Sequence, residues 1–152
     1  MSGRQLAGAL VAIALLTFVM PPLLARQVNA ARVARATEEA GRIANLAAED
    51  DGGAIGLTPP ASRLGPLVLA GPGTAPKFAE AAGWPEQGAT SAFSARPDPW
   101  GNHYLLVTPS RDNNTAVVLS AGPNGVVETA FAAAKSGDSA PTGDDVVIRR
   151  RR

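Results

Sequence analysis

The chain contains no cysteine and only one histidine among its 152 residues. Without cysteine it can form no disulfide, hold no metal through thiolates and use no thiol nucleophile. A histidine-clustered metal site is excluded as well, and the place of His103 directly after a turn motif favours a strand residue over a catalyst. Aromatic residues make up only 5% of the chain, so we expect a small and largely aliphatic core.

The sequence also lacks the usual patterns of active sites and of nucleic-acid binding. No serine stands in a motif that would activate it as a nucleophile, and no paired-carboxylate or glycine-rich phosphate-binding pattern is present. Four of the 14 Lys and Arg residues form the run 149–152, and the others are outnumbered by 13 acidic residues. We expect that run to be a solvated tail, and we predict that the protein is neither an enzyme nor a nucleic-acid-binding protein.

The longest apolar run starts at Leu6 and continues for twenty residues without a charge, between Arg4 and Arg26. A helix of that length spans roughly 30 Å, the thickness of the hydrocarbon core of a bilayer. We therefore predict a membrane-spanning helix. Pro21 and Pro22 lie near the end of this run, and each removes a backbone donor, so we expect a kink or a local break there.

A cleaved secretory signal is the alternative for the same run. Residues 1–5 would then be the basic leader, 6–20 the apolar core, and 28–30 would offer the small or apolar residues that a signal peptidase reads. A secreted or periplasmic binding domain released after Ala30 would follow from that interpretation. Composition alone does not separate the two.

Residues 26–49 are rich in good helix formers and contain no proline, which predicts that the helix continues out of the membrane. Glu38 and Glu39 stand four and three residues before Arg42, a spacing that allows helical ion pairs. A narrow apolar stripe lies near the end of the helix, and the run 50–53 is expected to end it. The stripe consists of Ile43, Leu46 and Ala47.

Proline interrupts residues 54–97 too often for long elements, so we expect a loop-rich connector that covers the helix with its apolar side chains. Within it, 64–70 reads as a short strand or a packed loop, and Thr74 with Pro76 suggests a brief helix to Ala82. The expected organisation is an N-terminal assembly helix, a continuing soluble helix, this connector and a β-sheet domain with a basic tail. Their bounds are 1–25, 26–53, 54–97 and 98–152.

After Phe93 the pattern changes to short β-branched or aromatic runs separated by turn residues, at 103–108, 115–120, 126–129 and 145–148. The spacing predicts an antiparallel meander of three or four strands. Such a sheet must bury one face, and the second half of the long helix is the only long element available to cover it.

One pentapeptide combines turn residues with a large apolar side chain. Aspartate first, proline second and glycine fourth suit a type I turn, and the tryptophan can anchor that turn in a core. By itself this motif indicates a buried turn and nothing more. Its residues are Asp98, Pro99, Trp100, Gly101 and Asn102.

Together with its surroundings, the motif DPWGNHYLLV resembles the β-domain of the major pseudopilin of type II secretion systems and its relatives. The likeness continues in the strand and turn VLSAGPNG at 118–125 and in the acidic segment GDDVV at 143–147. These three motifs occur in the order of that family, behind an apolar helix that carries proline near its membrane exit.

The resemblance implies an α+β fold of the type IV pilin-like class, in which a long N-terminal helix, membrane-spanning in its first half, packs on a small antiparallel β-sheet. It implies a structural subunit of a type II secretion or related periplasmic filament. The partners would be further copies, other pseudopilins, the inner-membrane secretion platform and lipid. The chain would cross the bacterial inner membrane once, with its C-terminal domain in the periplasm.

The assembly helix departs from the family at its start. Family precursors carry a basic leader that ends in glycine, and a glutamate at the fifth position of the mature chain. Here Gly3 is followed by Arg4, and the fifth residue is Gln5. If Met1 corresponds to the mature start, the helix proline of the family falls at Pro22, which suggests an absent or very divergent leader. The assembly residues expected from the resemblance are Gln5, Leu6, Pro21 and Pro22.

The C-terminal loop of the major pseudopilin binds calcium, so the resemblance points to a calcium site in this chain. Calcium prefers six to eight hard oxygen ligands, and two adjacent carboxylates facing a polar turn can begin such a site. The alternative is that 143–145 is simply a turn before the last strand. The residues implied as ligands are Ser120, Asn124, Asp144 and Asp145.

Overall fold

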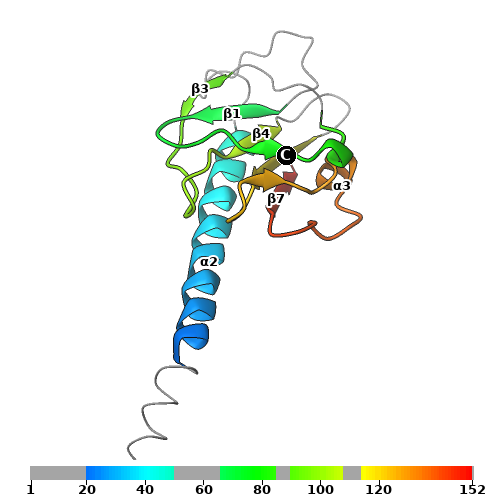
Figure 1. Cartoon of the computed structure of the whole chain (residues 1–152). Coiled ribbons are helices and arrows are strands. Elements are labelled where there is room, and N and C mark those ends of the chain that lie inside the picture. Colours follow the sequence, from blue (N-terminus) through cyan, green and yellow to red (C-terminus); the bar gives the residue numbers. More distant parts are fainter. Residues whose placement is uncertain (1–19, 50–65, 85–89, 108–113, 152) are drawn as a thin grey trace, which may run out of the picture. The chain divides into compact units, whose positions relative to one another are not determined.

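The computed structural model describes residues 20–49, 66–84, 90–107 and 114–151. It shows an α+β fold in which the long helix α2 (Met20–Glu49) packs against a mostly antiparallel sheet (Figure 1). The chain divides into two units, Met1–Arg32 and Val33–Arg152, and the second unit contains the sheet and the part of α2 that packs on it. The kind of fold expected from the sequence, a long helix on a small sheet, is therefore confirmed.

The predicted membrane-spanning run lies largely outside the described residues, as do Gln5, Leu6 and the helix stop at 50–53. Within the described ranges, no helix is both long enough and apolar enough to cross a bilayer. Pro21 and Pro22 lie inside α2, which is helical without a break from Met20 onward.

Small side chains form the face of α2 that contacts the sheet. Alanine makes up most of this face, so the helix backbone can lie close to the strands, and Ile43 is its one large side chain. The expected stripe is confirmed at Ile43 and Ala47, whereas Leu46 is 37% exposed. Arg42 forms the predicted ion pair with Glu39, 2.6 Å apart, on the outer surface. The buried helix residues are Ala36, Ala40, Ile43, Ala44 and Ala47.

Five strands form the main sheet in the order β3-β1-β4-β5-β7. The pairs β1-β4, β4-β5 and β5-β7 are antiparallel, and β3 pairs in parallel with the other edge of β1. The predicted strands at 103–108, 115–120 and 145–148 correspond to three of these. The bounds are β1 Leu67–Ala70, β3 Thr90–Ser94, β4 Leu105–Val107, β5 Thr115–Ser120 and β7 Val146–Arg151.

Both faces of the sheet are buried. Successive aliphatic side chains along each strand point alternately into two separate cores. Paired positions Leu106, Val118 and Ile148 face α2, where Tyr104 also donates a hydrogen bond to the carbonyl of Ala36. The neighbouring pair Leu105 and Leu119 faces a second core. Burial on both sides explains why β4 and β5 are continuous apolar runs.

A second layer covers the face away from α2. It contains a parallel pair of two-residue strands, a 3-10 turn and a short helix, and the ring of Trp84 contacts Phe78 at a tilt and Phe131 edge to face. The indole of Trp84 donates to the carbonyl of Thr129 at 2.7 Å, which satisfies its only donor. The elements are β2 Lys77–Phe78, η1 Glu80–Ala82, β6 Val126–Val127 and α3 Phe131–Ser136.

Several expectations for the middle of the chain need correction. The strand interpretation of 64–70 is confirmed by β1, but the apolar side chains of 66–84 divide between the two cores, whereas they were expected to cover the helix. The brief helix expected from Thr74 is wrong, since Lys77 and Phe78 are extended and pair with β6, and only η1 turns. The run 126–129 is not a strand of the meander, because β6 pairs with β2 in the outer layer.

The described arginines do not form a tail, because they are the last half of β7 and pair with β5, although Arg150 and Arg151 are exposed as expected. The guanidinium of Arg149 donates to the carbonyls of Ala133 and Ala134 in α3, and that of Arg150 donates to Asn45 of α2. Alternation along the strand therefore directs two successive arginines to helices on opposite faces of the sheet.

Two positions of α2, Ile43 and Leu46, should differ clearly in their contribution to stability, because one is buried and the other is partly exposed. We expect Ile43→Ala to lower the free energy of unfolding by about 3 kcal/mol, because it leaves a cavity between α2 and the sheet. Leu46→Ala, three residues away and partly exposed, should cost less than about 1 kcal/mol. Chemical denaturation followed by circular dichroism measures both, and equal losses would contradict this description of the core.

Candidate functional site

The motif at 98–102 forms the predicted turn around a buried carboxylate. The amide of Gly101 donates to the carbonyl of Asp98 at 3.0 Å, which closes the turn. One oxygen of Asp98 accepts hydrogen bonds from the amides of Trp100 and Asn102, at 3.0 and 2.8 Å. Asp98 is 3% exposed, and these donors compensate the cost of burying its charge.

The second carboxylate oxygen of Asp98 joins this turn to the end of β5. It accepts a hydrogen bond of 2.6 Å from the hydroxyl of Ser120 and a longer one from the side chain of Asn102. The same Asn102 amide group donates to the carbonyl of Gly122 at 2.8 Å. The turn thus holds the chain that leaves β5 at two places, Ser120 and Gly122.

On its other side, the loop 121–125 contacts Asp144. The carboxylate of Asp144 accepts a hydrogen bond of 3.2 Å from the amide of Asn124. Gly122 has a φ of +63° and lies so close to Asp144 that a Cβ would overlap both its carbonyl and its carboxyl carbon. The loop is therefore held between Asn102 and Asp144.

The neighbouring carboxylate, Asp145, holds the chain between β6 and α3. One of its oxygens accepts hydrogen bonds from the amides of Glu128 and Thr129, at 2.9 and 2.6 Å. The residue is only 7% exposed, and this burial raises the pKa of the Asp145 carboxyl above its usual value, against the effect of the amides. The adjacent charge of Asp144 raises the pKa further.

Each of the two aspartates has one oxygen, Oδ1, that is buried and accepts no hydrogen bond from the described residues. A buried carboxylate oxygen without a donor is costly, and a bound cation would remove that cost. The described ranges contain no group of three or more His, Cys, Asp or Glu side chains suited to a metal. Neutral oxygens would have to complete the shell, which suits calcium better than zinc.

The structure brings only part of the predicted ligand set together. Asn124 lies against Asp144, but its side-chain oxygen accepts a hydrogen bond from Val126, and the Ser120 hydroxyl donates to Asp98. Sequence reasoning missed Gly122 as a neighbour of Asp144, and Asn102 as the residue that holds Gly122. It also missed Glu128, whose carboxyl group lies against Gly143. For Gly122 the sequence offered one signal, the segment VLSAG at 118–122, in which a glycine follows the serine at the second position. A glycine there allows another chain segment to approach closely.

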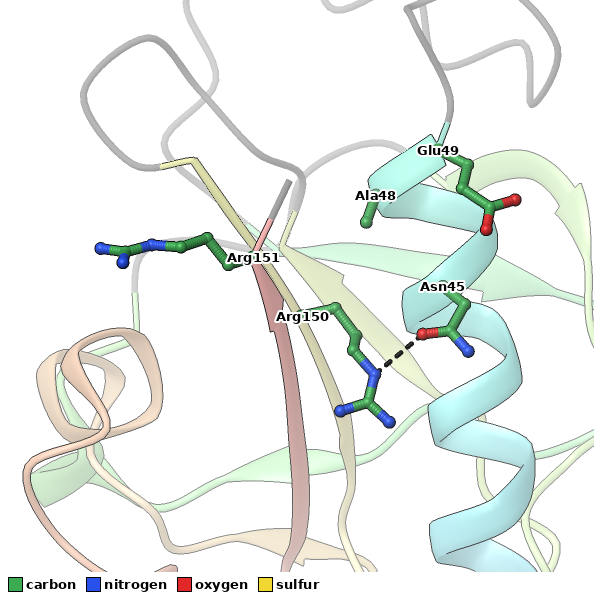
Figure 2. Close-up of a pocket in the computed structure, with 5 residues that line it drawn as sticks. All are labelled: Asn45, Ala48, Glu49, Arg150 and Arg151. Carbon is green, nitrogen blue, oxygen red and sulfur yellow. Dashed lines mark hydrogen bonds between the residues drawn. The ribbon is translucent and has the colours of Figure 1, made fainter.

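Within the described ranges, the other polar groups form no comparable site. His103 precedes β4, and its amide donates to the carbonyl of Thr74. A hollow of about 270 Å³ lies between the end of α2 and β7 (Figure 2). The hollow is lined by the carboxylate of Glu49 and by two arginines, and it lies beside the negative C-terminal end of α2. These opposite charges favour neither an anionic nor a cationic ligand. Its lining residues are Asn45, Ala48, Glu49, Arg150 and Arg151.

Comparison of the chain with known protein families, with characterised proteins and with solved structures gives no match.

A pair of glycine substitutions tests how tightly the loop contacts Asp144. Gly83 has a φ of +61°, nearly that of Gly122, but a Cβ there would meet no described atom within 4 Å. We expect Gly83→Ala to cost about 1 kcal/mol of stability through backbone strain alone. Gly122→Ala should cost about 2 kcal/mol more, because Asp144 must move. Equal losses in chemical denaturation would show that the loop has room.

Proposed function

We propose that the protein is a structural subunit of a pilin-like filament, of the kind built by pseudopilins in type II secretion. The N-terminal helix anchors the subunit in the bacterial inner membrane and packs against the helices of further copies. The sheet domain lies in the periplasm. The secretion platform and other pseudopilins are the expected partners, and the role is mechanical and not enzymatic.

The observation that carries this proposal is the change in burial along α2. Every residue from Pro21 to Arg35 is exposed, whereas Ala36 begins the face that packs on the sheet. Large aliphatic side chains are among the exposed ones, including Leu24 at 56% and Val28 at 51%. An exposed helix with such side chains gains stability from lipid or from another helix.

Cysteine cross-linking tests the assembly. Because the chain has no cysteine, a single substitution gives one reactive site. We expect Val28→Cys to yield cross-linked dimers in membranes when treated with a bismaleimide of about 10 Å, the distance between packed helices; one thiol per chain limits the product to dimers. Denaturing electrophoresis separates the products.

Ser136→Cys is the matched control, since Ser136 is exposed on α3 of the sheet domain. Its cross-linking should be several-fold weaker than that of Val28→Cys. Equal yields at both positions would contradict assembly through α2. A soluble species that begins near Ala31, detected by mass spectrometry, would instead support the secreted binding domain.

We further propose that the acidic pair at the start of β7 binds calcium. The support is the two buried Oδ1 atoms of Asp144 and Asp145 and their position beside a polar loop. When bound, the ion would supply positive charge to both carboxylates and tie the start of β7 to the loop 121–125. Its role would be structural, as a stabiliser of the sheet domain.

Calcium should raise the thermal midpoint of the full chain in detergent micelles, relative to EDTA and to magnesium. A concentration of 100 times the dissociation constant corresponds to about 2.7 kcal/mol. Because burial raises the pKa of Asp145, protons compete for its carboxylate as the pH falls, so the calcium effect should be largest near neutral pH and decline on acidification.

The variants Asp144→Asn and Asp145→Asn should lose this calcium effect. Asp138→Asn, an exposed aspartate between α3 and the acidic pair, should keep it. If calcium leaves the midpoint of the unmodified protein unchanged at neutral pH, the cation proposal is wrong while the filament proposal is still decided by cross-linking.

A further inference from the structure

We infer that Asn102 is a positioning residue of the cation site, which it reaches through Gly122 without touching the ion. This inference rests on the proposed calcium site. It assigns to the turn 98–102 a role beyond that of a buried structural turn.

The contacts form a direct path from the turn to the acidic pair. The side chain of Asn102 is 8% exposed and donates to the carbonyl of Gly122 at 2.8 Å. That carbonyl also accepts a weaker hydrogen bond, 3.3 Å, from the amide of Gly125. With both of its lone pairs occupied, the Gly122 carbonyl is turned toward Asn102 and is not free to act as a ligand.

The other side of Gly122 contacts Asp144, with no space for a single methyl group between them. A displacement of Gly122 must therefore move Asp144 or the loop that donates to it through Asn124. Asn102 also fills the space beneath Gly125, where a Cβ would come within 3.2 Å of its side-chain oxygen. It thus supports both ends of the turn 122–125.

Asn102 is itself held in one orientation by Asp98. Its backbone amide donates to one carboxylate oxygen of Asp98, and its side chain approaches the other at 3.4 Å. A carboxylate that orients an amide, which in turn orients a loop beside the ligands, is the arrangement expected of residues that support a metal site from outside its ligand shell. Removing such support typically weakens metal binding 10–100-fold.

The test compares Asn102→Ala with Asn45→Ala in the full chain in detergent micelles, titrated with calcium chloride by calorimetry. Asn45 on α2 accepts a hydrogen bond of 2.8 Å from Arg150 of β7, so Asn45→Ala makes the same substitution and removes a hydrogen bond outside the loop. We expect calcium affinity to fall about tenfold in Asn102→Ala and to change less than twofold in Asn45→Ala. Unchanged affinity in Asn102→Ala would overturn the inference.

Amide hydrogen exchange in EDTA gives a second readout that needs no cation. Exchange at the amides of Gly122 and of residues 124–126 should accelerate in Asn102→Ala and stay unchanged in Asn45→Ala. If Asn102→Ala does not fold, Asn102→Ser replaces it, because the serine hydroxyl is too short to reach Gly122 but keeps a polar group at the turn.

The possible results distinguish the positioning role of Asn102 from the proposed calcium site and from the proposed filament. Calcium binding by the unmodified protein together with unaltered binding and exchange in the Asn102 variant would overturn the positioning role alone. No calcium binding by the unmodified protein would overturn the positioning role together with the cation site. Neither result bears on cross-linking through Val28, which tests the filament.

Discussion

The buried carboxylate of Asp98 is the interaction on which the arrangement of the sheet domain depends. It has no cation beside it among the described residues and is compensated by hydrogen-bond donors from its own turn and from Ser120 at the end of β5. A charge in that position tolerates few alternative geometries, because each lost donor leaves it less compensated in a medium of low polarity. The turn before β4 and the loop after β5 are consequently held in one relative position.

A chain poor in aromatic residues obtains its cores from alanine and branched aliphatics, and this choice determines how the elements meet. Alanines on α2 let the helix approach a sheet whose strands are apolar on both sides. Three of the aromatic side chains that the structure describes, Phe78, Trp84 and Phe131, contact one another in the outer layer, where Trp84 joins β2 and α3. Small side chains bury little area each. Because they pack closely, their atoms still gain favourable dispersion contacts.

The local features of the fold were predictable from sequence, and the long-range ones were not. Helix formers at 26–49, the run 115–120 and the turn 98–102 each express a preference within a few residues, and the structure contains all three. Strand β1 is short and lies beside prolines, so the sequence offered it as a strand or a packed loop, and its place between β3 and β4 depends on pairing with both. Arginines 149–151 are extended because β5 pairs with them, which no local propensity indicates.

In the candidate site, the acidic pair was found by resemblance. The bonds from Asp98 to Ser120 and from Asn102 to Gly122 span about twenty residues and could not be read from spacing.

The contacts between α2 and the sheet have a consequence for the order of folding. Tyr104 reaches Ala36 across 68 residues of sequence, and Arg150 reaches Asn45 across 105. Helices form within about a microsecond, whereas contacts of such separation require the closure of long loops and form much later. During this interval the alanine face of α2 has no sheet to cover it. The face is covered only when β4, β5 and β7 have come together, so the time that sheet closure takes sets how long these small apolar side chains stay in contact with water.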